Sequence, residues 1–203
     1  MKALLLDLDR TLVDVQTFTD YAAAVSDLED RFGPLPGSAD VPDTYWRKAT
    51  VAAMEALVAW SGTARWKEAS DVIETYEAAA VPASTPMPGL DEFLSVTSDR
   101  RRAVVTLMGG GAARDTLAAH RIGITALVPR LPDLPPKPAP DQLRAGIGLL
   151  DCRPGETVMI GDSSWDREAA VAAGIEFIGV GEADFGPDVV VASGLLGVFD
   201  LID

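Results

Sequence analysis

Short apolar runs and alanine-rich amphipathic runs succeed one another along the 203-residue chain. The run at residues 2–8 is short and apolar and has no helical period, so it predicts a buried strand. A long stretch without any strand signal follows, in which apolar residues recur at helical spacing. This stretch predicts three helices, at residues 15–32, 45–60 and 65–80. Segments rich in Gly, Pro and Ser separate them, at residues 33–43 and 61–63.

The pattern changes after residues 82–89, whose sequence PASTPMPG is typical of a linker. Strands and helices then alternate up to the C-terminus. The expected strands are residues 102–107, 124–128, 157–162 and 175–181, and the expected helices are residues 113–123, 141–151, 163–174 and 195–202. Such alternation indicates an α/β fold with a doubly wound parallel sheet and helices on both of its faces.

The first strand therefore belongs to the same sheet as the later strands, and the helical stretch is inserted between them. We expect a Rossmann-like core built from residues 1–14 and 86–203, with an all-helical insertion at residues 15–85. The chain is 48% hydrophobic and 24% charged, so it can bury a sizeable core. Its length suits one large domain that carries an insertion.

The net charge of −14 and the pI near 4.4 limit the classes of partner. An acidic protein repels nucleic-acid phosphates and anionic membrane surfaces, so we expect neither as a partner. The apolar run near the N-terminus is too short for a signal peptide or a membrane span. The single cysteine, Cys152, excludes an intramolecular disulfide and favours a reducing compartment. These features together predict a cytoplasmic protein.

Polar residues follow the carboxyl ends of the predicted strands, where ligands bind in parallel α/β sheets. They are Asp7 and Asp9 after the first strand, Thr106 after the second, Lys137 in a proline-rich loop, and Asp162 and Asp166 after the strand at 157–162. Residues two apart in an extended segment point the same way, so Asp7 and Asp9 can face one pocket. Each residue alone is common in turns or on surfaces. Their order at successive strand ends is what indicates a site.

Three converging carboxylates repel one another unless a cation lies among them. Mg²⁺ suits such a site, because it takes a few oxygen ligands and leaves positions for water and substrate phosphate. A threonine hydroxyl, a lysine ammonium and backbone N–H groups can hold phosphate oxygens. One carboxylate is then left to attack phosphorus. The pattern therefore favours phosphoryl transfer at a magnesium site.

In their order along the chain, DLDRTLVD, the Thr of VVTL, KPAPD and GDSSWDREAAVAAG resemble the four motifs of the haloacid dehalogenase-like hydrolase superfamily. The segment PMPGLDEFL is similar to the one that re-enters the core in the phosphoglycolate phosphatase and β-phosphoglucomutase branch. That branch carries a helical cap inserted after the first strand. For the insertion at residues 15–85, the resemblance extends to its position and its helical character.

The resemblance implies a role for each matched carboxylate. Asp7 would be the nucleophile that attacks phosphorus in line. Asp9 would be the general acid that protonates the leaving oxygen, then the base that activates water on the aspartyl-phosphate. The metal ligands would be Asp7, the backbone carbonyl of Asp9, and Asp162.

The resemblance also implies how the phosphoryl group is held. Thr106 and Lys137 would bind it, and Lys137 would offset the charge of Asp7. The supporting residues would be Asp166 and Ser163, which orient Lys137 and metal-bound water. Most of the rate enhancement would then come from this arrangement of charges.

Two positions depart from the family pattern. Arg10 stands where this branch commonly has glycine, and we interpret it as a tolerated residue that can also contact the leaving group or the cap. In the family an asparagine often follows soon after this threonine, whereas Thr106 is followed by LMGGG. The backbone N–H of Leu107 can still bind phosphate. The glycines at 109–111 either widen the entry to the next helix or offer further N–H donors.

The presence of Asp9 bears on the reaction, since dehalogenases and phosphonate-cleaving members of the superfamily lack an aspartate there. It favours hydrolysis of a small phosphorylated metabolite, such as phosphoglycolate or a sugar phosphate. A phosphomutase stays open, because it needs the same core residues. The alternative outside catalysis is a phospho-acceptor or scaffold domain. A receiver-like acceptor, however, has adjacent acids after its first strand and no cap.

The cap would set specificity by closing over the site. Its charged and aromatic candidates for substrate contact are Arg31, Trp46, Arg47, Lys48, Arg65, Trp66 and Lys67. We expect most of them to be surface charges or packing aromatics. In the core, we expect Trp165 to pack and His120 to be structural or exposed. Both a monomer and a homodimer are compatible with the sequence.

Overall fold

The computed structural model describes residues 2–38, 41–181 and 183–202, so that residues 39–40 of the predicted break at 33–43 lie outside the described part. One large sheet is built from β1 (Ala3–Leu6), β4 (Arg102–Val105), β5 (Ala126–Val128), β6 (Thr157–Gly161), β7 (Glu176–Val180) and β8 (Val190–Ala192). Its strand order is β5-β4-β1-β6-β7-β8. Every neighbouring pair is parallel. The first strand therefore lies in the middle of a sheet formed with strands from the second half of the chain.

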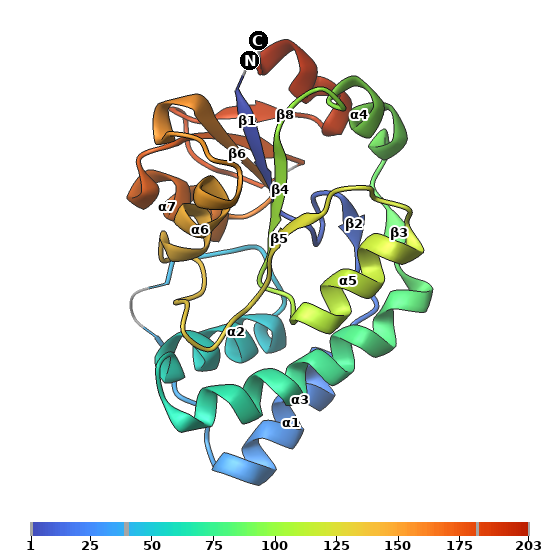
Figure 1. Ribbon diagram of the computed structural model, residues 1–203. Helices are drawn as coiled ribbons and strands as arrows, with labels where there is room; N and C mark the ends of the chain where they lie inside the picture. Colours follow the sequence, from blue (N-terminus) through green and yellow to red (C-terminus); the bar gives the residue numbers. More distant parts are fainter. Residues whose placement is uncertain (1, 39–40, 182, 203) are drawn as a thin grey trace.

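Helices cover both faces of this sheet (Figure 1). They are α4 (Leu90–Val96), α5 (Gly110–Ala119), α6 (Asp141–Leu149) and α7 (Ser164–Ala173), and a 3₁₀ helix η3 (Leu195–Leu201) lies near the C-terminus. The side chains of α4, α5 and η3 share one apolar cluster with the sheet, and those of α6 and α7 share another. The predicted doubly wound α/β fold is confirmed.

The leucine run of β1 reflects its central position. Leu4 and Leu6 pack in the cluster on the α4 and α5 side, whereas Leu5 packs with Leu143 of α6 on the other face. All three leucines are completely buried. Successive residues of a strand point to opposite faces, so a strand buried on both faces needs an uninterrupted apolar run.

A second group of helices, the three-helix cluster, lies beyond the carboxyl ends of the sheet strands (Figure 1). It consists of α1 (Tyr21–Phe32), α2 (Lys48–Trp60) and α3 (Ala64–Ala80), and it has an apolar core of its own. A short antiparallel ribbon of β2 (Val13–Asp14) and β3 (Thr85–Pro86) joins the start and the end of this insertion. The three predicted helices are therefore present, and the division into core and cap domains stays a prediction.

The boundaries differ from the sequence prediction where local hydrogen bonds override the apolar pattern. The helix expected from residue 15 begins at Tyr21, because the Asp20 side chain accepts a hydrogen bond from the Ala23 backbone N–H at 3.0 Å and caps it there. The helix expected at 113–123 runs instead over Gly110–Ala119. The last predicted helix, at 195–202, is a 3₁₀ helix over Leu195–Leu201.

Six short elements were not predicted from the sequence. These are α4, β8, the two strands of the ribbon, and the 3₁₀ helices η1 (Val81–Ala83) and η2 (Pro154–Glu156), all two to seven residues long. Such lengths are too short for an apolar period to emerge. No helix in the described part of the chain combines the length and hydropathy needed to cross a bilayer.

Candidate active site

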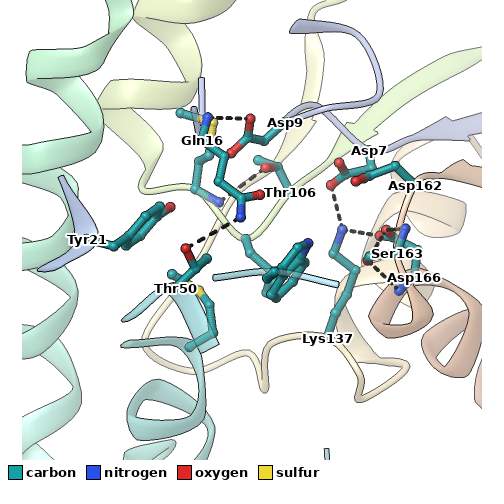
Figure 2. Close-up of a pocket in the computed structure, with 14 residues that line it drawn as sticks. Asp7, Asp9, Gln16, Tyr21, Thr50, Thr106, Lys137, Asp162, Ser163 and Asp166 are labelled. Atoms are coloured by element: carbon teal, nitrogen blue, oxygen red, sulfur yellow. Dashed lines mark hydrogen bonds and ion pairs between the residues drawn. The ribbon is translucent and has the colours of Figure 1, made fainter. Parts of the chain in front are cut away.

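A pocket lies between the carboxyl ends of the central strands and the three-helix cluster (Figure 2). Every site residue predicted from the sequence lines it except Arg10: Asp7, Asp9, Thr106, Leu107, Lys137, Asp162, Ser163 and Asp166. Further lining comes from Met108 and from five residues of the insertion, Gln16, Tyr21, Trp46, Thr50 and Met54. The pocket is narrow, since its free volume of about 30 Å³ accommodates only one or two water molecules.

Lys137 is the centre of the charged side of the pocket, although only 1% of its surface is exposed. Its Nζ donates to Asp7 Oδ1 at 2.7 Å, to Asp166 Oδ1 at 2.5 Å and to the Val105 carbonyl at 3.1 Å. Burial alone favours the neutral amine, but the two carboxylates raise the pKa of Lys137 above its usual value. The lysine is therefore a fixed positive charge beside Asp7.

Gln142, on α6, holds the loop that carries Lys137. Its Oε1 accepts a hydrogen bond from the Lys137 backbone N–H at 3.0 Å. Its Nε2 donates to the carbonyls of Thr106 and Pro129, at 2.9 and 3.0 Å. One buried amide thus hydrogen-bonds to three loops: the loop after β4, the loop after β5 and the proline-rich loop that contains Lys137. Gln142 was not among the residues predicted from the sequence, because nothing in its local pattern marks it.

The carboxyl groups of Asp7, Asp162 and Asp166 form a buried cluster in which the nearest oxygens lie within 4.8 Å of one another. Burial raises the pKa of Asp7 well above its usual value, against the attraction of Lys137. Burial likewise raises the pKa of Asp162 to about 7. A cation among these oxygens would remove the repulsion, and an all-oxygen donor set suits a hard divalent ion.

The two acids after β6 have different partners. Asp166 accepts hydrogen bonds from Lys137 and, through Oδ2, from the Ser163 hydroxyl at 2.5 Å. Asp162 accepts from the Thr11 hydroxyl at 3.2 Å and from the Tyr45 hydroxyl. Asp166 is therefore paired with the lysine of the pocket, whereas the donors to Asp162 are neutral hydroxyl groups. The supporting role of Asp166 and Ser163 stays a prediction. The predicted binding of a metal ion by the Asp9 backbone carbonyl stays a prediction.

Asp9 is oriented by the backbone of the insertion. Its Oδ1 accepts hydrogen bonds from the N–H groups of Val15 and Gln16, each at 2.9 Å. Burial raises the pKa of Asp9 to about 7, although these hydrogen bonds favour the ionised form. A carboxyl group with a pKa near 7 can both donate and accept a proton at neutral pH.

The loop after β4 is held from the side of the three-helix cluster. Arg130, which follows β5, forms a bidentate ion pair with Glu77 of α3, with N–O distances of 2.9 and 3.2 Å. Arg130 also donates to the Leu107 carbonyl at 2.6 Å and to the Ser70 hydroxyl at 2.9 Å. Arg130 and Glu77 are only 3% and 1% exposed. This pair was not predicted from the sequence, because its two members lie far apart in the chain.

The glycines after Leu107 make room for carboxylates from α3. Glu77 accepts a hydrogen bond from the Gly109 N–H at 2.8 Å, and Glu74 accepts one from the Gly111 N–H at 2.5 Å. A Cβ atom at Gly109 would lie 2.4 Å from Glu74 Cδ, and one at Gly111 would lie 2.6 Å from Glu74 Oε1. The glycines therefore widen the entry to α5, as one of the two interpretations proposed. The N–H groups of Gly109 and Gly111 already donate hydrogen bonds to Glu77 and Glu74 of the three-helix cluster.

Arg10 lies beside the pocket, next to Tyr45. Its backbone has a φ of 64°, in the left-handed region that favours glycine, which accounts for the glycine of the family pattern. Its guanidinium carbon lies 5.3 Å from the centre of the Tyr45 ring. This position places Arg10 against the segment that precedes α2. Its predicted contact with the leaving group stays a prediction.

Of the insertion residues considered for substrate contact, Trp46 alone lines the pocket. Trp46 packs on Trp165, with ring centres 5.2 Å apart, and Trp165 is completely buried as expected. Trp66 is buried within the three-helix cluster. Arg31 and Lys67 pair with acids on the surface, Arg65 lies over the Phe32 ring, and Arg47 and Lys48 are exposed. His120 hydrogen-bonds the Ser84 hydroxyl at 2.8 Å, in keeping with a structural role.

Comparison with solved structures places this geometry among known folds. A hydrolase from Pseudomonas syringae is 21% identical with a TM-score of 0.73, covering 100% of this chain and 98% of that one. A phosphoglycolate phosphatase candidate from Lactobacillus plantarum is 18% identical with a TM-score of 0.71, covering 98% of both chains. CbbY from Rhodobacter sphaeroides, solved with phosphate, is 17% identical with a TM-score of 0.71, covering 98% and 96%. At these identities the likeness concerns the fold.

Sequence comparisons define the family. No protein in a curated set matches this chain. The model of the haloacid dehalogenase-like hydrolases, in contrast, matches residues 1–174, which include every motif residue described above. The chain therefore belongs to the haloacid dehalogenase-like hydrolase family.

Proposed function

We propose that this protein is a Mg²⁺-dependent phosphatase that hydrolyses a small phosphorylated metabolite through an aspartyl-phosphate on Asp7. The observation that carries the proposal is the 2.7 Å contact between Asp7 and Lys137 in a buried pocket that also contains Asp162 and Asp166. Burial of a carboxylate without a partner is energetically costly, and these three carboxylates of the pocket also repel one another. The arrangement therefore needs compensating positive charge, part of which Lys137 supplies.

The proposed reaction begins with attack of a carboxylate oxygen of Asp7 on phosphorus. Lys137 and Thr106 hold the transferring phosphoryl group, with the Leu107 N–H as a further donor. Asp7, Asp162 and the Asp9 carbonyl would hold Mg²⁺, which when bound neutralises charge on the phosphoryl oxygens. Asp166 and Ser163 keep Lys137 in place. The carboxylate of Asp7 then carries the phosphoryl group as an acyl phosphate.

Asp9 supplies the proton in this scheme. In its protonated form it donates to the oxygen of the leaving alcohol as the P–O bond breaks. The resulting carboxylate then takes a proton from the water that attacks the phosphorus of the aspartyl-phosphate. The P–O bond to Asp7 breaks in this step, so that inorganic phosphate leaves and Asp7 is again a free carboxylate. A pKa near 7 supports both roles, because the group changes its protonation state at little cost near neutral pH. The hydrogen bonds from Val15 and Gln16 keep its carboxyl group oriented.

The three-helix cluster is proposed to act as the cap. It lies over the strand ends and provides one wall of the pocket, and the free volume of about 30 Å³ is too small for a phosphate ester. A substrate therefore enters by displacing part of this wall, which afterwards excludes bulk water from the acyl phosphate. We propose a cytoplasmic setting, with a small phosphorylated metabolite as the partner and either a monomer or a homodimer as the assembly.

The proposal is tested with p-nitrophenyl phosphate and a panel of metabolite phosphates, each measured with Mg²⁺, with excess EDTA, and after Mg²⁺ is restored. We expect phosphate release that EDTA abolishes and Mg²⁺ restores. Phosphate release that is insensitive to EDTA, or no release from any ester, would contradict the proposal. A mutase would instead convert one phosphate isomer into another with little free phosphate.

A further inference from the structure

The pocket has two sides of different character (Figure 2). Asp7, Asp162, Asp166 and Lys137 lie on one side, and Gln16, Tyr21 and Thr50 lie on the other, with Asp9 and Thr106 between them. The side formed by the insertion, here called the neutral wall, consists of Gln16, Tyr21, Trp46, Thr50 and Met54. None of these five side chains carries a charge. Among the described residues that line the pocket, Lys137 is the one cation, and it is already paired with two carboxylates.

The neutral wall has hydrogen-bonding capacity that the protein uses only weakly. The Gln16 amide donates to the Thr50 hydroxyl at 3.4 Å, and the Tyr21 hydroxyl donates to Glu77 at 3.5 Å, both at the limit of a hydrogen bond. The buried indole N–H of Trp46 finds no partner among the described residues. Such groups can re-pair with hydroxyl groups of a ligand at little cost. They provide directional contacts without a full charge.

The charges next to the neutral wall cannot compensate an anion. Asp9 lies beside Gln16, and Glu77 lies behind the Tyr21 hydroxyl. The nearby cation, Arg130, has five N–H donors, and all of them are used, by Glu77, the Leu107 carbonyl and Ser70. Arg10 lies outside the lining of the pocket, against the Tyr45 ring. A second anionic group on a substrate would therefore be buried near two acids, and none of the described residues that line the pocket offers it an unpaired cation. Such burial is strongly unfavourable.

We propose that this site selects phosphate monoesters of small uncharged alcohols and rejects esters that carry a carboxylate or a second phosphate, with Gln16, Tyr21 and Thr50 as the specificity-determining residues. This inference rests on the proposed phosphatase function and narrows its substrate class. It sets this chain apart from the activity named for its phosphoglycolate phosphatase neighbours. It also favours hydrolysis over mutase chemistry, since a mutase must hold a bisphosphate with its second phosphate against the neutral wall.

A matched pair of esters tests the proposal. 2-Hydroxyethyl phosphate and phosphoglycolate have the same two-carbon skeleton and differ in one group, a neutral CH₂OH against a carboxylate. We expect kcat/KM to be higher for 2-hydroxyethyl phosphate by about tenfold or more, equivalent to at least about 1.4 kcal/mol. Equal values, or a preference for phosphoglycolate, would overturn the inference.

Binding separates this inference from the phosphatase proposal. In the Asp7→Asn variant with Mg²⁺, calorimetry gives a Kd for each ester whether or not the native enzyme turns it over. We expect the hydroxyethyl ester to bind about tenfold more tightly or better. A preserved binding preference without hydrolysis in the native enzyme would refute the phosphatase alone. Absence of any binding preference would refute the neutral-wall proposal, even if both esters were hydrolysed.

A charge-introducing variant tests the assigned residues. Gln16→Lys places a cation of similar size on the neutral wall, and Thr17→Lys adds the same charge at the next residue, which is exposed and outside the pocket. The ratio of kcat/KM for the two esters cancels any effect on the shared chemistry. We expect Gln16→Lys to move this ratio toward phosphoglycolate by about tenfold, and Thr17→Lys to leave it unchanged. An unchanged ratio in Gln16→Lys, or an equal change in both variants, would overturn the assignment.

Discussion

The guanidinium of Arg130 and the carboxylate of Glu77 form a buried bidentate ion pair that joins the three-helix cluster to the sheet core. The pair also holds the loop that contributes Leu107 to the pocket, because Arg130 donates to the Leu107 carbonyl and Glu77 accepts from the Gly109 N–H. A core loop that lines the pocket is thus positioned by an ion pair between the core and the insertion. This relationship makes stability and pocket geometry depend on the same contacts.

Removal of one partner should destabilise the protein strongly. We expect Glu77→Leu and Arg130→Met each to lower the free energy of unfolding by about 3–5 kcal/mol, because each leaves a buried charged group without its partner. The double variant Glu77→Leu/Arg130→Met should lose much less than the sum of its single variants. Urea unfolding followed by circular dichroism measures all of these values.

A surface ion pair supplies the control for that experiment. Arg31 and Glu68 pair at 3.2 Å with about half of each side chain exposed. Arg31→Met should therefore change the free energy of unfolding by less than about 1 kcal/mol. Additive losses in the double variant of the buried pair, or equal losses in the buried and surface variants, would contradict the interpretation.

The glycine at 109 should be needed for space and not for backbone conformation. Its φ of −62° is accessible to any residue, but a Cβ atom there would displace Glu74 from the start of α5. We expect Gly109→Ala to cost about 1–2 kcal/mol, the typical value of lost hydrogen bonds at a helix N-terminus. Gly110→Ala is the control, since its Cβ would meet its nearest neighbours at an ordinary 3.5 Å. In a Glu74→Ala background the cost of Gly109→Ala should vanish; a persistent cost would show that another contact is responsible.

Mg²⁺ should stabilise the protein in a pH-dependent manner. Burial raises the folded-state pKa of Asp162 to about 7 and that of Asp7 well above its usual value. Without a cation, the stability that comes from each protonated form is therefore lost as pH rises through the folded-state pKa, which for Asp162 is about 7. Mg²⁺ binds the ionised carboxylates. We therefore expect Mg²⁺ to increase Tm more at pH 8 than at pH 6, as measured by differential scanning fluorimetry.

The Asp162→Asn variant is the control for the metal. It keeps the size of the side chain and removes one of the charges that a cation would neutralise. We expect its Tm to respond to Mg²⁺ much less than that of the native protein. A full response in this variant would place the metal elsewhere, and a larger response at pH 6 than at pH 8 would contradict binding to titrating carboxylates.

The proposed acid role of Asp9 predicts a dependence on the leaving group. The Asp9→Asn variant should lose about 10²–10⁴-fold in kcat on alkyl phosphates, the usual contribution of general acid–base catalysis. It should lose less on p-nitrophenyl phosphate, whose leaving group departs without a proton. Steady-state kinetics with both esters measures this difference. Equal losses would assign Asp9 to metal binding or orientation alone.

The sequence predicted much of the fold and most of the charged side of the site, for a physical reason. In a parallel sheet, residues that directly follow buried strands must converge at one edge, so Asp7, Thr106 and Asp162 could be placed together from strand signals alone. Lys137 was harder, because its loop has no regular period. The resemblance to a family supplied its role, and the structure places its ammonium beside Asp7.

The neutral wall and the buried ion pair could not be predicted in the same way. Tyr21, Thr50 and Glu77 lie on amphipathic helices, where position along the helix does not reveal which buried residue faces the pocket and which faces the helical core. Arg130 resembled any other arginine in a loop. Such contacts depend on how the insertion packs on the sheet, which local sequence patterns do not encode.

The most direct test of the central claim is phosphate release from p-nitrophenyl phosphate by the Asp7→Asn variant with saturating Mg²⁺, after circular dichroism has shown a native fold. We predict that this variant folds and has no activity above background, because asparagine cannot form the acyl phosphate. The native enzyme, measured beside it, should release phosphate until the substrate is consumed. Activity of the folded variant that approaches the native rate would contradict the assignment of Asp7 as the nucleophile, and with it the proposed mechanism.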